Sequence, residues 1–101
     1  MKIIAVNINK ALASGASELV ATERAWKLNL NNCSGFDYVI GISGGVIRGW
    51  YNLNGVHVDY LEPPRLKFDL TDCDPSDAKK IDNYINKMGI QLSKIRTKYI
   101  R

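Results

Sequence analysis

The sequence predicts one α+β domain: a mostly antiparallel sheet, or a small and partly open barrel, of five or six strands with two helices. Three observations carry this prediction. Short apolar segments alternate with Gly, Asn and Pro breaks, two segments repeat apolar residues at helical spacing, and two central dipeptides are typical of tight hairpins. At 101 residues, 46% of them apolar and 24% charged, the chain has the length and composition of a single globular domain over residues 1–101.

The N-terminal third predicts a strand, then a helix, then a loop. Residues 2–8, "KIIAVNI", have the apolar, β-branched content of a half-buried strand. Residues 14–30 change period and repeat apolar side chains every three or four positions, which indicates a helix capped by Ser14 or Ser17. We expect Trp26 to be buried on this helix. The asparagine-rich run "NLNNCSG" then indicates a loop.

Residues 37–60, "DYVIGISGGVIRGWYNLNGVHVDY", predict three strands joined by two tight turns. Gly44-Gly45 and Asn54-Gly55 are two-residue hairpin signals, because such turns need positive φ, which Gly and Asn supply most readily. With both turns in place, Ile42 faces Ile47 across the first hairpin, and one face of this meander is apolar. The second face holds Val39, Gly41, Ser43, Val46, Arg48, Trp50, Asn52, His57 and Asp59.

This second face has two interpretations. An exposed Trp50 beside Arg48 on a sheet is how many single-strand nucleic-acid binders present a stacking platform. Asn52, His57 and Asp59 would then supply polar specificity. In the alternative, the helix over residues 14–30 covers this face. Trp50 then belongs to a second core, and Arg48 and Asp59 form a cross-strand ion pair.

The C-terminal part predicts a strand, a well-capped helix and a last strand. Residues 65–70, "RLKFDL", alternate apolar and polar side chains as a one-sided strand does. The helix begins after Asp74 as N-cap, ends at Gly89 and carries an apolar stripe. The stripe consists of Ala78, Ile81, Ile85 and Met88. Residues 93–101 add the last strand. An exposed edge at 65–70 or 94–101 would allow pairing with a second copy in a homodimer.

The net charge of +4 is concentrated at the C-terminus. Acidic and basic residues cancel over positions 1–89, whereas the last twelve residues hold four cations and no acid. The four are Lys94, Arg96, Lys98 and Arg101. This asymmetry indicates an anionic partner, either nucleic acid or the acidic patch of a protein.

Several classes of protein and site are disfavoured. No apolar run approaches the roughly 20 residues of a membrane span, and the N-terminus lacks a signal-peptide cleavage pattern, so we expect a cytoplasmic protein without membrane contact. Cys33 and Cys73 are 40 residues apart, with one His in the chain, so we expect reduced thiols and neither a structural zinc nor another cofactor.

Catalysis is not favoured either. His57 and Asp59 lie two apart on one predicted strand, and Ser43 lies in a hairpin turn rather than in a strand-to-helix elbow. The turn formed by residues 43–45 is followed by a strand, whereas a phosphate loop needs a helix there. The sequence leaves enzymatic activity open but favours a binding function.

The run "AWKL…DYVIGISGGVIRGWYNL…RLKFDL…NYINK…TKYI" resembles small β-rich domains of uncharacterised phage and defence-related proteins, and its central strand pair is similar to the barrel of PUA and ASCH domains. The resemblance rests on apolar spacing and turn glycines over about residues 22–100. It implies binding of RNA or of modified bases.

The leading hypothesis is therefore a small non-enzymatic domain that binds nucleic acid or a nucleotide. Trp50 would stack on a base, Arg48 would hold a phosphate or base edge, and the basic C-terminus would add unspecific attraction. The alternative is a protein-binding module or inhibitor, encoded by a phage or mobile element, that acts on a host or defence enzyme.

Overall fold

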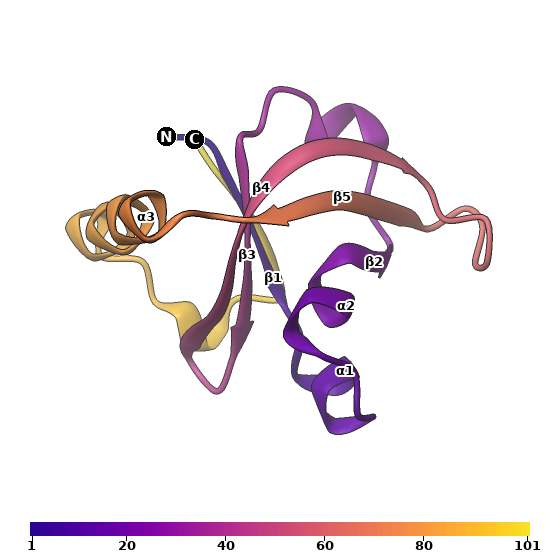
Figure 1. Ribbon diagram of the computed structural model, residues 1–101, viewed down its shortest axis with the longest axis horizontal. Coiled ribbons are helices and arrows are strands. Elements are labelled where there is room, and N and C mark those ends of the chain that lie inside the picture. Colours follow the sequence, from indigo (N-terminus) through magenta and orange to yellow (C-terminus); the bar gives the residue numbers. More distant parts are fainter.

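The computed structural model describes residues 1–101, except for the side chain of Ala25, and confirms the α+β class. A six-stranded mixed sheet with the order β2-β5-β4-β3-β1-β6 stays open and does not close into a barrel (Figure 1). The strands are β1 Ile3–Asn7, β2 Arg24–Trp26, β3 Tyr38–Ser43, β4 Val46–Val58, β5 Leu66–Asp72 and β6 Thr97–Ile100. The helices are α1 Asn9–Ala13, α2 Glu18–Glu23 and α3 Pro75–Met88, with short 3-10 turns at Leu30–Cys33 and Leu92–Lys94.

Helices cover the sheet on both faces (Figure 1). On the side of α1 and α2, one core includes Val39 and Phe68, both fully buried. On the side of α3, a second core includes Ile40 and Ile81, also fully buried. Adjacent residues of β3 thus enter opposite cores, because successive side chains of a strand point to opposite faces. None of the described helices has the length and hydrophobicity needed to span a bilayer.

The predicted three-stranded meander is wrong, because residues 37–60 form only two strands. The hairpin at Gly44-Gly45 is present, with positive φ at both glycines. Asn54-Gly55 is instead a bulge within β4, which runs on and pairs with β5. The extra residue places both Leu53 and Val56 in the core on the α2 side, although a regular strand would send them to opposite faces. Packing of both partly buried side chains against this core explains why the bulge replaces the turn.

A second irregularity shifts the register between β3 and β4. Ile42 faces Ile47 as predicted, but the pairing then skips Arg48, so that Ile40 faces Trp50 rather than Gly49. Because a shift of one residue exchanges the two faces of a strand, the predicted second face of the meander is divided between the two sides of the sheet. The parallel pairing of β1 with β3 was also not expected, and it makes the sheet mixed.

The predicted helix over residues 14–30 is two short helices and a strand. Of the two predicted caps, Ser14 and Ser17, it is Ser17 that caps α2, by accepting a hydrogen bond from the Val20 amide. The chain becomes extended at Arg24, and β2 pairs with β5. Trp26 therefore lies half-buried on a strand, where its Nε1 donates to the Thr22 carbonyl at 2.7 Å. Pairing along β5 replaces the last turns of the expected helix.

Helix α3 matches its prediction closely. Asp74 accepts a hydrogen bond from the Asp77 amide at 2.9 Å, Pro75 occupies the first turn, and Gly89 ends the helix with φ of 66°. Ile81 and Ile85 are buried, as the stripe predicts. The assignment of Met88 to that stripe is wrong, because its side chain is exposed.

The sheet edges are formed by β2 and β6. The predicted edge at 65–70 is wrong, because β5 lies between β2 and β4. The last strand does lie at an edge, where it pairs with β1 alone. Homodimer formation through that edge stays a prediction.

Candidate ligand-binding site

The structure separates the residues that the sequence assigns to one polar face. Trp50 and Asn52 lie on the α3 side of β4, where Asn52 is near Thr71 and Cys73. His57 follows beyond the bulge, with Nδ1 at 3.7 Å from the carboxylate of Asp69. Ser43 donates to the side chain of Asn9, so no chain of hydrogen bonds joins it to His57. The five predicted binding residues of the meander therefore do not form one surface.

Trp50 is not an open stacking platform. Its indole is half-buried beside α3, and its Nε1 donates to the Asp82 carboxylate at 2.7 Å. It lines a cavity of about 290 Å³ together with Ile85 and Asn86. The alternative interpretation, in which helical residues cover this face, is correct in part: α3 covers Trp50, whereas α2, within the segment 14–30, covers Val39.

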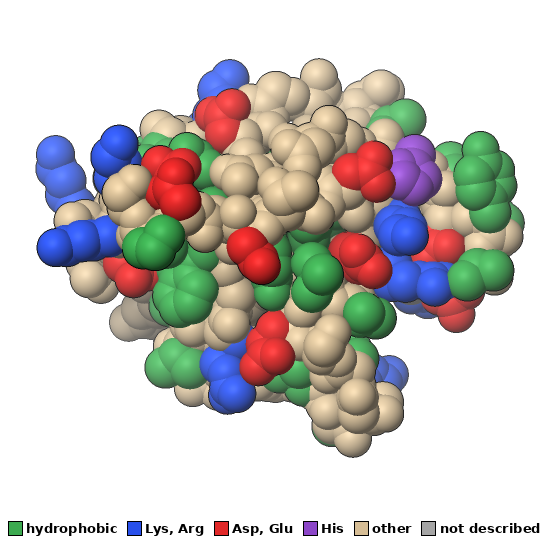
Figure 2. All heavy atoms as spheres, viewed as in Figure 1, with side chains coloured by type: hydrophobic (Ala, Val, Ile, Leu, Met, Phe, Trp, Pro, Cys, Tyr) green, Lys and Arg blue, Asp and Glu red, His purple; other side chains and the backbone are tan. Residues whose placement is uncertain are grey.

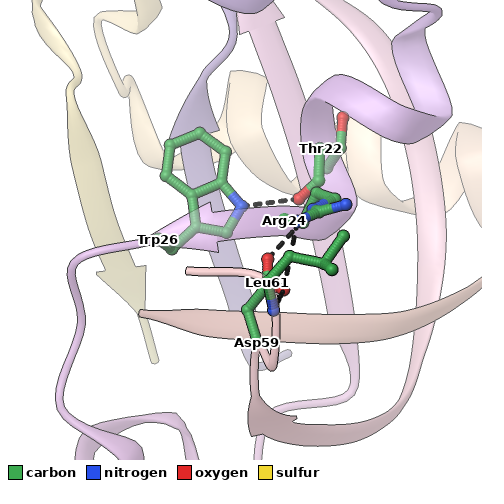
Figure 3. Close-up of polar contacts among 5 residues, drawn as sticks. All are labelled: Thr22, Arg24, Trp26, Asp59 and Leu61. Atoms are coloured by element: carbon green, nitrogen blue, oxygen red, sulfur yellow. Dashed lines mark hydrogen bonds and ion pairs between the residues drawn. The ribbon is translucent and has the colours of Figure 1, made fainter. Parts of the chain in front are cut away.

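The predicted ion pair of Arg48 with Asp59 is also wrong. Arg48 is exposed, with a guanidinium nitrogen 3.6 Å from the Glu18 carboxylate. Asp59 is 3% exposed and accepts from Arg24, Nε to Oδ2 at 2.9 Å and Nη2 to Oδ1 at 3.1 Å (Figure 3). The Leu61 amide donates to the same carboxylate at 3.0 Å. The role of Asp59 is therefore to hold the loop between β4 and β5 against β2.

The basic C-terminal residues lie on the edge strand β6 and on the segments that flank it. Lys94, Arg96, Lys98 and Arg101 are all exposed. The carbonyl of Arg96 accepts from the Asn7 amide at 2.8 Å, and the carbonyl of Arg101 accepts from the Tyr84 hydroxyl at 3.4 Å. The guanidinium carbon of Arg101 lies 5.2 Å from the centre of the Phe36 ring, within cation–π range. Arg101 is therefore directed toward the segment that precedes β3.

That segment borders a cavity that the sequence analysis missed. We call it the bulge cavity; it measures about 620 Å³ and lies between residues 30–36 and the bulge of β4. Its lining residues are Leu30, Asn31, Cys33, Ser34, Gly35, Phe36, Leu53, Asn54, Gly55 and Val56. Gly55 could have indicated this cavity from the sequence. A glycine inside a strand pattern often marks a bulge, and bulges occur frequently next to functional sites.

The bulge cavity combines apolar walls with a polar and cationic border. Phe36, Leu53 and Val56 belong to the adjoining core. The Asn54 amide donates to Thr71 at 3.1 Å, which leaves its carbonyl oxygen as an acceptor. Besides Arg101 over Phe36, the Lys2 ammonium reaches Gly35, where it lies 3.8 Å from the position that a Cβ atom would take. The site is suited to a flat, partly apolar molecule that carries negative charge.

The thiol at this cavity is not an activated nucleophile. Burial raises the pKa of Cys33 above its ordinary value, and its Sγ lies 4.0 Å from the Tyr99 hydroxyl. Burial is also the main cause that raises the pKa of Tyr99 to about 12, with Cys33 adding to it. Both groups are therefore neutral near pH 7, and they contribute packing and hydrogen bonding rather than charge.

Cys73 is expected to react slowly with iodoacetamide at neutral pH. Burial, followed by the charges of Asp77, Asp74 and Asp72, raises the pKa of its thiol to about 11. Because the thiolate is the reactive form, alkylation of the folded protein should be about 100-fold slower than that of a thiol with a pKa of 9. Peptide mapping after timed alkylation distinguishes Cys73 from Cys33, and urea-unfolded protein is the control. A rate that stops rising below pH 9 would contradict the prediction.

Both cysteines are free, and among the described residues no group of three or more His, Cys, Asp or Glu side chains is placed to hold a metal ion.

Comparison with known proteins finds no family model, no curated protein and no solved structure that matches the chain. The similarity to phage, defence-related and PUA or ASCH domains therefore stays a prediction.

Proposed function

We propose that this chain is a small binding domain for a nucleotide or for single-stranded nucleic acid, and that a base enters the bulge cavity. One observation carries the proposal: a cavity of about 620 Å³ has apolar walls, and two of its lining residues, Phe36 and Gly35, lie next to the cations Arg101 and Lys2. The hypothesis from the sequence is retained in its ligand class, but the binding site moves from Trp50 to this cavity.

The dimensions and chemistry of the cavity support a base as ligand. Its volume is within the range of roughly 300–1,000 Å³ that small-molecule sites show. Leu53 and Val56 offer apolar contact for the faces or edges of a ring. Asn31 and Asn54 are among the lining residues, and side-chain amides pair with the donors and acceptors of a base edge.

The surrounding charge supports a phosphate-bearing ligand. Arg101 presents a planar guanidinium, which binds phosphate oxygens in pairs, and Lys2 adds a second positive charge. Lys94, Arg96 and Lys98 add exposed positive charge from the 3-10 turn at Leu92–Lys94 to β6, where they would attract further phosphates of a nucleic-acid strand. Binding rather than catalysis is proposed, because the thiol at the cavity is held in its protonated form.

The test is fluorescence anisotropy with labelled single-stranded DNA and RNA oligonucleotides, with unlabelled mononucleotides as competitors. Arg101→Ala should weaken binding about 10-fold, the loss expected for one charge-assisted contact. Arg48→Ala is the matched control, because Arg48 is an exposed cation that pairs with Glu18 of α2, whereas Arg101 contacts the lining residue Phe36. If the protein contacts two phosphates, raising the salt concentration from 50 to 200 mM should also weaken binding roughly 5–10-fold.

Three results would contradict the proposal. Absence of binding to single-stranded DNA, RNA and mononucleotides at low salt would exclude nucleotides and nucleic acid as ligands. Equal losses in Arg101→Ala and Arg48→Ala would show general attraction to a positive protein instead of a site at the cavity. Binding that is lost in Trp50→Phe but kept in Arg101→Ala would place the site beside α3 and overturn the assignment.

A further inference from the structure

The loop between β4 and β5 projects from one end of the molecule and exposes apolar side chains. It extends past the sheet at the right of Figure 1, where Figure 2 shows hydrophobic side chains gathered beside Lys and Arg. Tyr60 is 88% exposed and Leu61 75%, the highest values among the exposed large apolar residues of the described chain. We call residues 59–65 the tip loop. Adjacent exposed apolar residues of this size are typical of an interaction surface.

The tip loop is held in one shape before any partner binds. Asp59 accepts from Arg24 and from the Leu61 amide, as Figure 3 shows. Its own amide donates to the Arg65 carbonyl at 2.7 Å, and its carbonyl accepts from the Glu62 amide at 3.1 Å. Because these bonds fix the backbone, binding through the tip loop would not have to order it, which lowers the entropic cost of association.

A cavity lies next to this projection, at the same end of the molecule. It measures about 290 Å³ and is lined by residues 27–29, which follow β2, and by Pro64 and Arg65 of the tip loop itself. Leu28 and Pro64 give it apolar walls. A surface that carries a projection beside a cavity is self-complementary. A two-fold axis between two copies lets the tip loop of each copy fill the cavity of the other.

The charges at this end have the same self-complementarity. Glu62 is exposed on the tip loop, and Lys27 is exposed at the cavity. A two-fold axis that places the tip loop of one copy in the cavity of the other brings Glu62 of each copy toward Lys27 of its partner. The charged contact is therefore made twice, and opposite charges across an interface favour one orientation over others.

From these observations we infer that two copies of the chain associate through the tip loop, each inserting Tyr60 into the cavity formed by residues 27–29, Pro64 and Arg65 of the other. The contact differs from pairing of the β6 edges and does not depend on the proposed ligand. A contact made by one loop and one small cavity should bury less area than a standard protein interface, so we expect a weak dimer with a dissociation constant on the order of 10–100 µM.

Sedimentation velocity between roughly 5 and 500 µM protein tests this inference, a range that brackets the association expected of so small an interface. The weight-average sedimentation coefficient of the wild-type chain should rise with concentration. Tyr60→Ser combined with Leu61→Ser should raise the dissociation constant at least ~10-fold, because the two most exposed apolar contacts are lost. Val46→Ser is the matched control, an exposed apolar residue beside the other hairpin. Circular dichroism should show all variants folded.

Charge reversal gives a second and independent measurement. Glu62→Lys and Lys27→Glu should each weaken association, whereas the chain carrying both substitutions should regain most of it, since each reversed pair is restored across the axis. A sedimentation coefficient that stays monomeric throughout would overturn the inference and favour a different protein as the partner of the tip loop. Association that Tyr60→Ser and Leu61→Ser leave unchanged would overturn it as well.

Discussion

Replacing Arg24 by Met is expected to lower the free energy of unfolding by about 3 kcal/mol. The substitution leaves the Asp59 carboxylate, 3% exposed, without the two charged hydrogen bonds at 2.9 and 3.1 Å that compensate its burial. Loss of one partner from a buried pair is strongly destabilising because the remaining charge is uncompensated. Urea titration followed by circular dichroism measures the change.

Two comparisons make this prediction specific. Arg24→Met combined with Asp59→Leu should be less destabilised than Arg24→Met alone, because the second substitution removes the buried charge. Arg48→Met, which breaks the exposed pair with Glu18, should cost less than about 1 kcal/mol. The prediction fails if Arg24→Met and Arg48→Met have similar effects. Arg24→Met should also speed amide exchange at Leu61, since the carboxylate that accepts this amide loses its anchor.

Replacing Gly41 by Ala is expected to cost about 2–3 kcal/mol of stability, as overpacking of a tight core does. A Cβ atom at Gly41 would overlap the Thr22 hydroxyl and lie 3.1 Å from Cδ1 of Ile8. Thr22 is fully buried, with its hydroxyl bonded to the Glu18 carbonyl at 2.7 Å, so it has little room to move. The free energy of unfolding from urea titration checks this value.

A double-mutant cycle tests the cause. In a chain that already carries Thr22→Ala, the further substitution Gly41→Ala should cost about 1 kcal/mol less, because the overlapping hydroxyl is absent. An equal cost in both backgrounds would mean that Thr22 is not the obstacle. The centre of β3 needs a glycine at position 41 because Thr22 of α2 lies too close for a side chain there.

The features that could be predicted from the sequence depend on neighbours along the chain. Asp74 and Gly89 terminate α3 through hydrogen bonds and backbone angles within a few residues, and both were identified. The Gly44-Gly45 turn was identified in the same way, because positive φ at two successive residues selects glycine locally. The apolar period of α3 correctly placed Ile81 and Ile85 in the core.

The candidate site was predicted poorly because its geometry depends on distant parts of the chain. The bulge cavity needs residues 30–36 beside the bulge of β4 and the last residue, Arg101, beside Phe36. Trp50 was correctly placed on a strand, but its exposure is decided by α3, which lies more than twenty residues further along. No local pattern records either contact.

The sequence by itself determined the α+β class, the limits of α3 and the first hairpin, because local hydrogen bonds and turn angles are decisive there. Only the tertiary structure decided that Asn54-Gly55 is a bulge and that the helix predicted over residues 14–30 ends at Glu23. At both places local preference was outweighed by pairing with β5, which buries Leu53 and Val56 and brings Arg24 to Asp59. The partners of Leu53, Val56 and Arg24 in these contacts lie at least 12 positions away, and the gain in burial and hydrogen bonding exceeds the small difference between competing local conformations.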